Sequence, residues 1–175
     1  FNPEANLVEF LFCPANISKE VEAKAEALAA QVINAYGICG LLAVELFLDK
    51  EDNLLVNEVA PRPHNSGHHT IDSCYTSQFE QHLRAVLNLP LGSTKMKSPS
   101  VMVNLLGAPG HTGPAYYKHL EECLKIEGAH FHLYGKSTTK PFRKMGHATI
   151  VDESLERAVG KARWIQEKLE IVSGT

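Results

Sequence analysis

Two glutamates lie within apolar segments that are expected to form the two strands of a β-hairpin. Glu45 stands in the middle of residues 41–48, and Glu58 stands near the end of residues 54–59. A carboxylate in such a strand loses hydration, so a compensating partner is required. The polar stretch 49–53 joins the two runs, which is typical of a hairpin connection.

The pairing register decides what these carboxylates can do. If Leu48 pairs with Leu55, Glu45 lies opposite Glu58 on one face, where two unpaired carboxylates repel each other. A divalent cation between them removes the repulsion, and Mg²⁺ suits a few carboxylates that share the ion with substrate phosphates. A register shifted by one residue would place Glu45 opposite Asn57. Each glutamate would then face solvent or pair with a basic side chain.

The loop that follows, residues 61–70, is dense in hydrogen-bonding groups. Arg62 offers a planar fork for a phosphate or carboxylate, Gly67 permits close backbone approach, and the prolines stiffen the segment. These features predict an anion-binding loop beside the metal site. The other polar side chains of the loop include His64, Asn65, Ser66 and His68.

Two other interpretations of the loop remain open from its composition. One is a zinc site made by His64, His68 and His69, which is disfavoured because the spacing of four residues pairs ligands only on a helix. The other is a polar surface loop without a ligand, and the adjoining pair of glutamates argues against it.

The elements that must position these residues follow from the apolar pattern of the first half. A strand is expected at residues 7–12, and a helix with Ser18 as its N-cap is expected to end at Gly37. Ser77 opens a further helix with a capping-box sequence. The side chains expected to form the buried stripe of that helix are Phe79, Leu83, Val86 and Leu87.

The second half has the pattern of a small domain of its own. A short connector from Ser93 to Pro99 separates it from the first half. We therefore predict an α+β protein with domains at residues 1–92 and 98–175. Strands are expected at 101–106, 129–134 and 146–151, and helices at about 115–124 and at 153–169.

Composition narrows the class of protein further. The chain has 175 residues and a net charge of -3, which gives no electrostatic reason to expect a nucleic-acid partner. No apolar run approaches the roughly 20 residues of a membrane span. Four widely spaced cysteines without a C-x-x-C pair favour reduced thiols in a cytoplasmic protein.

Two segments carry a resemblance to a known family. Residues 40–47, followed by Asn57-Glu58, resemble the ATP-grasp enzymes. More narrowly, the run 57–68, NEVAPRPHNSGH, resembles the signature of the 5-(carboxyamino)imidazole ribonucleotide synthases. The match continues at residues 77–85, 134–136 and 143–147.

The resemblance implies a step of purine biosynthesis. The family joins bicarbonate to the exocyclic amine of aminoimidazole ribonucleotide, converts ATP to ADP and phosphate, and uses carboxyphosphate as the intermediate. By matching positions, Glu45 and Glu58 would hold Mg²⁺ on the ATP phosphates, with Asn57 beside them contributing to ATP binding.

Five further residues acquire roles from the same resemblance. Arg62, His64 and Asn65 would face bicarbonate, carboxyphosphate and the amine as catalytic residues. Lys136 and Arg143 would grip the 5′-phosphate of the ribonucleotide. Without the resemblance, the latter two would be interpreted as solvated cations of a turn.

The resemblance also implies a fold and partners. The chain would hold the C-terminal half of an ATP-grasp domain, an antiparallel sheet with helices, followed by a small α/β C-terminal domain. The lobe with the glycine-rich phosphate loop is not recognisable in these residues, so we expect a longer polypeptide, and no tight ATP binding or turnover by this chain alone. A homodimer and a functional pairing with the downstream mutase are further expectations.

Two alternatives in function stay open at this point. One is another ATP-grasp carboxylate–amine ligase, such as the formate-dependent purine transformylase, which would share the glutamate pair but use another acid. The other is a non-catalytic interaction domain derived from an ATP-grasp enzyme.

Overall fold

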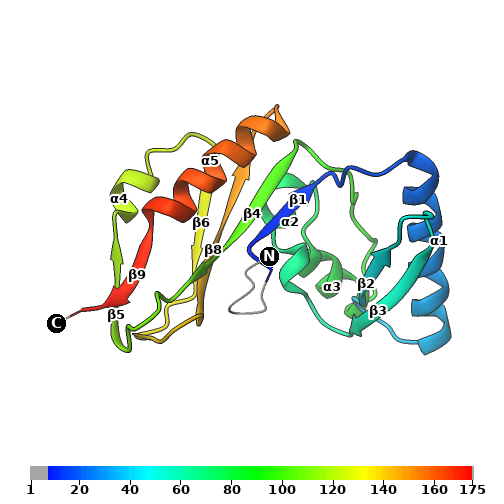
Figure 1. The fold of residues 1–175 in the computed structure, drawn as a ribbon. Coiled ribbons are helices and arrows are strands. Elements are labelled where there is room, and N and C mark those ends of the chain that lie inside the picture. The colour runs from blue at the N-terminus through cyan, green and yellow to red at the C-terminus, as the bar shows by residue number, and fades with distance from the viewer. Residues whose placement is uncertain (1–7, 175) are drawn as a thin grey trace. The chain divides into compact units, whose positions relative to one another are not determined.

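The computed structural model describes residues 8–174, and the chain divides into two compact units (Figure 1). The first unit is Ala15–Met96. The second consists of the chain from Lys97 onward together with the N-terminal segment that ends at Pro14.

The first strand lies in the second unit, although it falls within the first domain expected at residues 1–92. β1 (Phe10–Cys13) pairs antiparallel with β4 (Ser100–Leu106), with Phe10 opposite Val103. Sequence order hides this pairing because some 90 residues separate the two strands. Leu7, the expected first residue of the strand, lies outside the described residues.

Helix α1 (Lys19–Tyr36) begins and ends where its sequence predicts. The Ser18 side chain accepts a hydrogen bond from the Val21 backbone N–H, which satisfies one of the open donors of the first turn. Gly37 adopts the left-handed conformation at φ 61°, which a residue without Cβ adopts at little cost. The helix lies alongside the hairpin of β2 (Ala43–Leu48) and β3 (Leu54–Ala60) (Figure 1).

Three short helical elements complete the first unit: η1 (Asn65–Gly67), α2 (Thr70–Ser73) and α3 (Gln78–Val86). The capping of α3 is confirmed, because the Ser77 hydroxyl accepts from the Glu80 backbone N–H.

The buried stripe predicted for α3 is wrong within the described residues. Phe79 is 38% exposed and Leu83 57%, and Val86 and Leu87 are exposed to a similar degree. An amphipathic pattern indicates an apolar helix face that is suited to packing against a partner. Residues 8–174 do not cover the apolar face of α3. The helix instead buries Gln78, which is 8% exposed.

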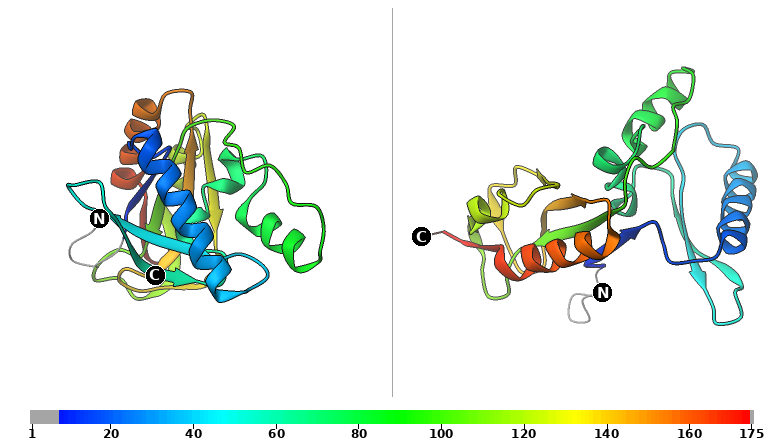
Figure 2. Two further views of the ribbon diagram at one scale, coloured as in Figure 1. Left: turned by 90° about the vertical axis from the view of Figure 1, so that its right-hand side faces the viewer. Right: turned by 90° about the horizontal axis from the view of Figure 1, so that it is seen from above.

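The second unit is built on a four-stranded antiparallel sheet in the order β1-β4-β8-β6, where β6 is Ala129–Leu133 and β8 is Lys144–Val151. Helix α5 (Leu155–Lys168) lies across one face of this sheet (Figure 2). The core between them contains Val101, Val103, Leu105, Ala148, Ile150, Ala158, Ala162 and Ile165.

A second sheet, in the order β7-β5-β9, corrects the helix expected at about 115–124. β5 (Gly113–Lys118) pairs with β9 (Glu170–Ser173). Only the last part of the expected helix, α4 (Leu120–Cys123), is therefore helical. The short strand β7 (Thr138–Thr139) pairs with the start of β5. Local propensity favoured a helix, but these pairings supply the backbone hydrogen bonds of β5.

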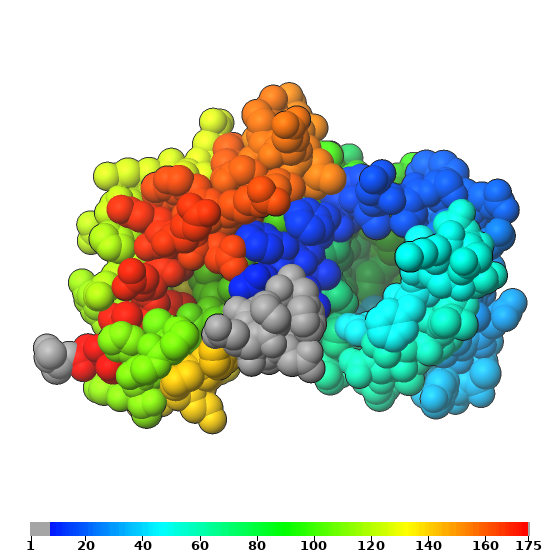
Figure 3. Space-filling model, in the orientation of Figure 1, coloured from blue at the N-terminus to red at the C-terminus, as the bar shows by residue number. Residues whose placement is uncertain are grey.

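The surface of the second unit is formed on one side by α5 and β9, which appear in orange to red in the space-filling view (Figure 3). No helix of residues 8–174 is long and apolar enough to cross a membrane.

The core under α5 yields a stability prediction. Ile165 is fully buried, so Ile165→Ala should lower the free energy of unfolding of this unit by about 2–5 kcal/mol through lost burial and a residual cavity. Urea unfolding followed by the fluorescence of Trp164, the single tryptophan, reports on this helix. Arg163→Ala, an exposed change on the same helix, should alter stability by less than about 0.5 kcal/mol. Equal effects of the two changes would contradict the assigned core.

Candidate functional site

The hairpin pairs Glu45 with Glu58, and a β-bulge is the reason. In the half of the hairpin next to its turn, Leu48 pairs with Leu54. The expected pairing of Leu48 with Leu55 is therefore wrong by one residue. Continued regularly, that register would set Glu45 opposite Asn57. The register shifts between Glu45 and Leu46, and β3 contributes one extra residue at this point, so that Glu45 pairs with Glu58.

Three side chains converge on the hairpin. Glu45, Glu58 and His64 each offer a ligand atom, and these atoms all lie within 4.8 Å of one another. His64 Nδ1 lies 3.5 Å from Glu45 Oε1, and His64 Nε2 lies 4.0 Å from Glu58 Oε1. The Asn57 amide lies 3.5 Å from Glu45 Oε2, so the bulged residue adds a polar group to the same cluster.

The three side chains of the cluster differ in solvent exposure. The side chain of His64 is 14% exposed, that of Glu45 38% and that of Glu58 62%. The histidine therefore forms the inner side and the two carboxylates the open side. The two carboxylate groups match the oxygen ligands that Mg²⁺ prefers, while zinc would favour more nitrogen or sulfur.

The remaining predicted residues of the loop differ in exposure. Arg62 is exposed, and its guanidinium donates a hydrogen bond to the Pro63 carbonyl at 3.0 Å. Asn65 is half-buried and begins the turn η1. His64 is the N-cap of this turn, since its imidazole accepts from the Ser66 backbone N–H.

Gln78, to which the sequence pattern assigned no role, holds the loop through hydrogen bonds to the His64 backbone. The Gln78 Oε1 atom accepts from the His64 backbone N–H at 2.8 Å, and Gln78 Nε2 donates to the His64 carbonyl at 2.8 Å. Gly67 packs against the same amide, where a Cβ would lie 2.5 Å from Oε1. The sequence contains a signal for this role, because Gln78 is a polar residue in the first turn of α3, directly after the capping residue Ser77. The capping-box pattern alone does not predict which segment the Gln78 side chain contacts.

His69 is separate from the cluster. Its ring is half-buried and Nδ1 is hydrogen-bonded to the Ser73 hydroxyl at 2.9 Å. Burial lowers the pKa of His69, because the charged imidazolium would lose hydration. The metal-type cluster found in residues 8–174 contains neither His68 nor His69.

The other two predicted residues lie in the second unit, on the turns between β6 and β8. Lys136 donates to the Lys144 carbonyl, and Arg143 donates to the carbonyl and hydroxyl of Thr138 at 2.8 and 3.0 Å. Burial, followed by the charges of Arg143 and Lys144, lowers the pKa of Lys136. Lys136 also lies 5.4 Å above the Tyr134 ring.

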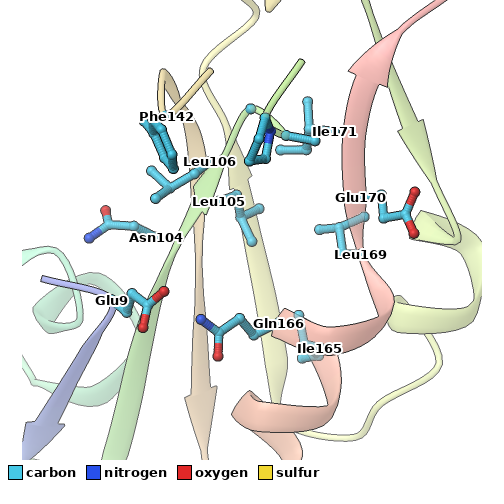
Figure 4. Close-up of a pocket in the computed structure, with 13 residues that line it drawn as sticks. Glu9, Asn104, Leu105, Leu106, Phe142, Ile165, Gln166, Leu169, Glu170 and Ile171 are labelled. Carbon is cyan, nitrogen blue, oxygen red and sulfur yellow. The ribbon is translucent and has the colours of Figure 1, made fainter. Parts of the chain in front are cut away.

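A pocket of about 230 Å³ in the second unit holds none of the predicted site residues (Figure 4). It is lined by Glu9 and Gln166 on one side and by apolar residues such as Leu105 and Ile171. A separate hollow of about 370 Å³ in the first unit is lined by Asn57 and Glu58.

Comparison with known proteins matches both halves of the chain. Residues 3–79 match the ATP-grasp domain, and residues 100–161 match the phosphoribosylaminoimidazole carboxylase C-terminal domain. The N5-carboxyaminoimidazole ribonucleotide synthase of Bacillus subtilis is 46% identical over 155 residues, which are 88% of this chain and 37% of that protein.

The chain belongs to the N5-carboxyaminoimidazole ribonucleotide synthase family.

Solved structures of the N5-carboxyaminoimidazole ribonucleotide synthase family share the fold. The synthetase of Thermotoga maritima is 50% identical with a TM-score of 0.92, over 94% of this chain and 46% of that chain. The synthase of Aspergillus clavatus in complex with ADP and 5-aminoimidazole ribonucleotide is 35% identical with a TM-score of 0.83, over 93% of this chain and 44% of that chain. The chain thus spans less than half the length of these relatives.

The packing of Gly67 gives a prediction for the loop. Gly67→Ala would place a methyl group 2.5 Å from Gln78 Oε1, so it should destabilise the first unit by about 1–3 kcal/mol. Urea unfolding followed by circular dichroism measures the change. Gly160→Ala on α5 meets nothing within 4 Å and should be neutral or stabilising by up to about 1 kcal/mol. Similar losses in both variants would argue against the contact.

Proposed function

We propose that this chain is the C-terminal part of an enzyme that carboxylates 5-aminoimidazole ribonucleotide with bicarbonate at the expense of ATP. The observation that carries the proposal is the convergence of Glu45, Glu58 and His64 within 4.8 Å at the edge of a hairpin. The names of the relatives provide the substrate class. Because the chain spans only part of those relatives, the remaining portion of the ATP site is assigned to the longer polypeptide.

In this proposal Glu45 and Glu58 hold Mg²⁺, and Asn57 adds an amide next to the ATP phosphates. The fit rests on the donor set, because two carboxylates facing each other across the strands lose their repulsion when a cation lies between them. The bound ion would neutralise negative charge on the ATP phosphates during phosphoryl transfer.

The protein residues of the loop would handle the acid. Bicarbonate oxygen attacks the γ-phosphorus of ATP, the bond to ADP breaks, and carboxyphosphate forms. Arg62 supplies a planar cation for this anion, and His64 and Asn65 supply hydrogen-bonding groups around it. Carboxyphosphate then releases phosphate and carbon dioxide, and the exocyclic amine attacks that carbon and loses a proton to give the carbamate.

Lys136 and Arg143 are proposed to bind the 5′-phosphate of the ribonucleotide. The support is electrostatic, because the charges of Arg143 and Lys144 add to burial in lowering the pKa of Lys136. An accumulation of like charge is costly, and a phosphate dianion relieves it.

The wider assignments belong to the same proposal. Residues 1–92 and 98–175 are assigned to the ATP-grasp lobe and to the small C-terminal domain, apart from β1, which joins the sheet of the second unit. A cytoplasmic location agrees with Cys39, Cys74 and Cys123 forming no disulfide. A homodimer and a functional pairing with the downstream mutase complete the proposal.

Removing one carboxylate of the pair tests the metal assignment. In the full-length polypeptide, Glu45→Gln and Glu58→Gln should each lower bicarbonate-dependent ADP release by about 100-fold and weaken Mn²⁺ binding in water-proton relaxation measurements, because one charged oxygen ligand is lost. Glu51→Gln, in the exposed hairpin turn, should change neither. Full activity of Glu45→Gln, or release of ADP with formate in place of bicarbonate, would refute the proposed reaction.

The phosphate assignment has an independent test. Lys136→Met should raise the KM for the ribonucleotide by about 10- to 100-fold with a smaller change in kcat, since a charge-assisted hydrogen bond to the phosphate is removed. Lys140→Met, an exposed lysine four residues away, is the matched control and should leave KM unchanged. An unchanged KM in Lys136→Met would exclude this lysine from the site.

A further inference from the structure

The carboxamide of Gln78 lies under the His64–His68 segment and has no freedom in its orientation. Its oxygen accepts from the His64 backbone N–H and its nitrogen donates to the His64 carbonyl, both at 2.8 Å. A flipped amide would set oxygen against oxygen and N–H against N–H, so the backbone of His64 fixes which end is which. Gln78 is 8% exposed, and an unsatisfied amide there would be costly.

The second proton of the amide nitrogen then determines the state of a neighbouring ring. Gln78 Nε2 lies 2.9 Å from His68 Nδ1. Since the amide nitrogen can only donate, His68 Nδ1 must accept and carries no proton. A neutral imidazole with an unprotonated Nδ1 bears its proton on Nε2.

Several contacts restrict movement away from this arrangement. The His68 ring stacks on Phe79, with centroids 5.6 Å apart and planes at 23°. The Thr70 hydroxyl donates to the Gly67 carbonyl at 2.6 Å and accepts from the Gln78 backbone N–H at 3.0 Å. The start of α3 and the histidine loop therefore form one hydrogen-bonded block.

We propose that Gln78 is a positioning residue that holds the backbone of His64, so that its imidazole faces Glu45 and Glu58, and fixes His68 as the neutral tautomer protonated on Nε2. In this state His68 Nδ1 already accepts from Gln78 and is not available as a general base. This consequence for catalysis rests on the proposed function, whereas the tautomer does not.

The chain provides a matched control three residues along the same helix. Gln81 clamps the backbone of Gly92 in the same way, with Gly92 N–H donating to Oε1 and Nε2 donating to the Gly92 carbonyl, both at 2.8 Å. Gln81 and Gln78 thus differ in the segment that they hold and not in the kind of contact. Gln78→Glu and Gln81→Glu each replace a donor by a carboxylate oxygen of the same size.

Long-range ¹H–¹⁵N spectra of the 175-residue chain, without substrate, read the tautomer directly. We expect His68 with its proton on Nε2 in the unaltered chain and in Gln81→Glu. In Gln78→Glu the carboxylate accepts where the amide donated, so His68 Nδ1 becomes protonated. A proton on His68 Nδ1 in the unaltered chain, or an unchanged His68 in Gln78→Glu, would overturn the inference.

Turnover of the full-length polypeptide separates this inference from the proposed function. Gln78→Glu should lower kcat by about 10-fold or more, with a smaller effect on the KM for the ribonucleotide, while Gln81→Glu retains kcat. If the unaltered enzyme is active and Gln78→Glu matches it, the positioning role fails and the function stands. If the spectra agree but the unaltered enzyme shows no bicarbonate-dependent ADP release, the function fails and the tautomer assignment stands.

Discussion

The first unit is organised around the repulsion between two carboxylates that face each other across a hairpin. A regular register would have avoided it by setting Glu45 opposite Asn57, yet the bulge brings Glu58 into that place and adds the Asn57 amide beside it. A bulge costs a ladder hydrogen bond and bends the strand, so it is expected where a side chain must be re-aimed. The juxtaposition is unfavourable for the isolated hairpin and favourable for one that holds a cation.

The loop after the hairpin is stiffened in two ways that act on different atoms. Pro61 and Pro63 reduce the conformations of the unfolded chain, and the buried amide of Gln78 satisfies the backbone of His64. The result is a histidine whose ring is 14% exposed and lies within 4.0 Å of Glu58 and 3.5 Å of Glu45. A site built in this way is preorganised, since its side chains do not have to be ordered when a ligand arrives.

The second unit places positively charged side chains close together through hydrogen bonds to backbone carbonyls. Lys136 and Arg143 occupy turns next to strands of the sheet, and each is held by a backbone carbonyl of a neighbouring turn or strand. Tyr134 provides a ring beneath Lys136, and its hydroxyl is hydrogen-bonded to buried His147 at 3.0 Å. Burial raises the pKa of Tyr134, so the phenol stays protonated beside the lysine.

The sequence by itself determined the local elements and the residue types of the site. Ser18 and Gly37 bound α1 because caps act within one turn, and the run NEVAPRPHNSGH identified the family because its polar groups are close in the chain. Only the tertiary structure decided the pairing of β1 with β4, the strand at Gly113–Lys118, the bulge at Asn57 and the support from Gln78. These features depend on partners distant in sequence or on a register offset of one residue, and neither is encoded by local periodicity.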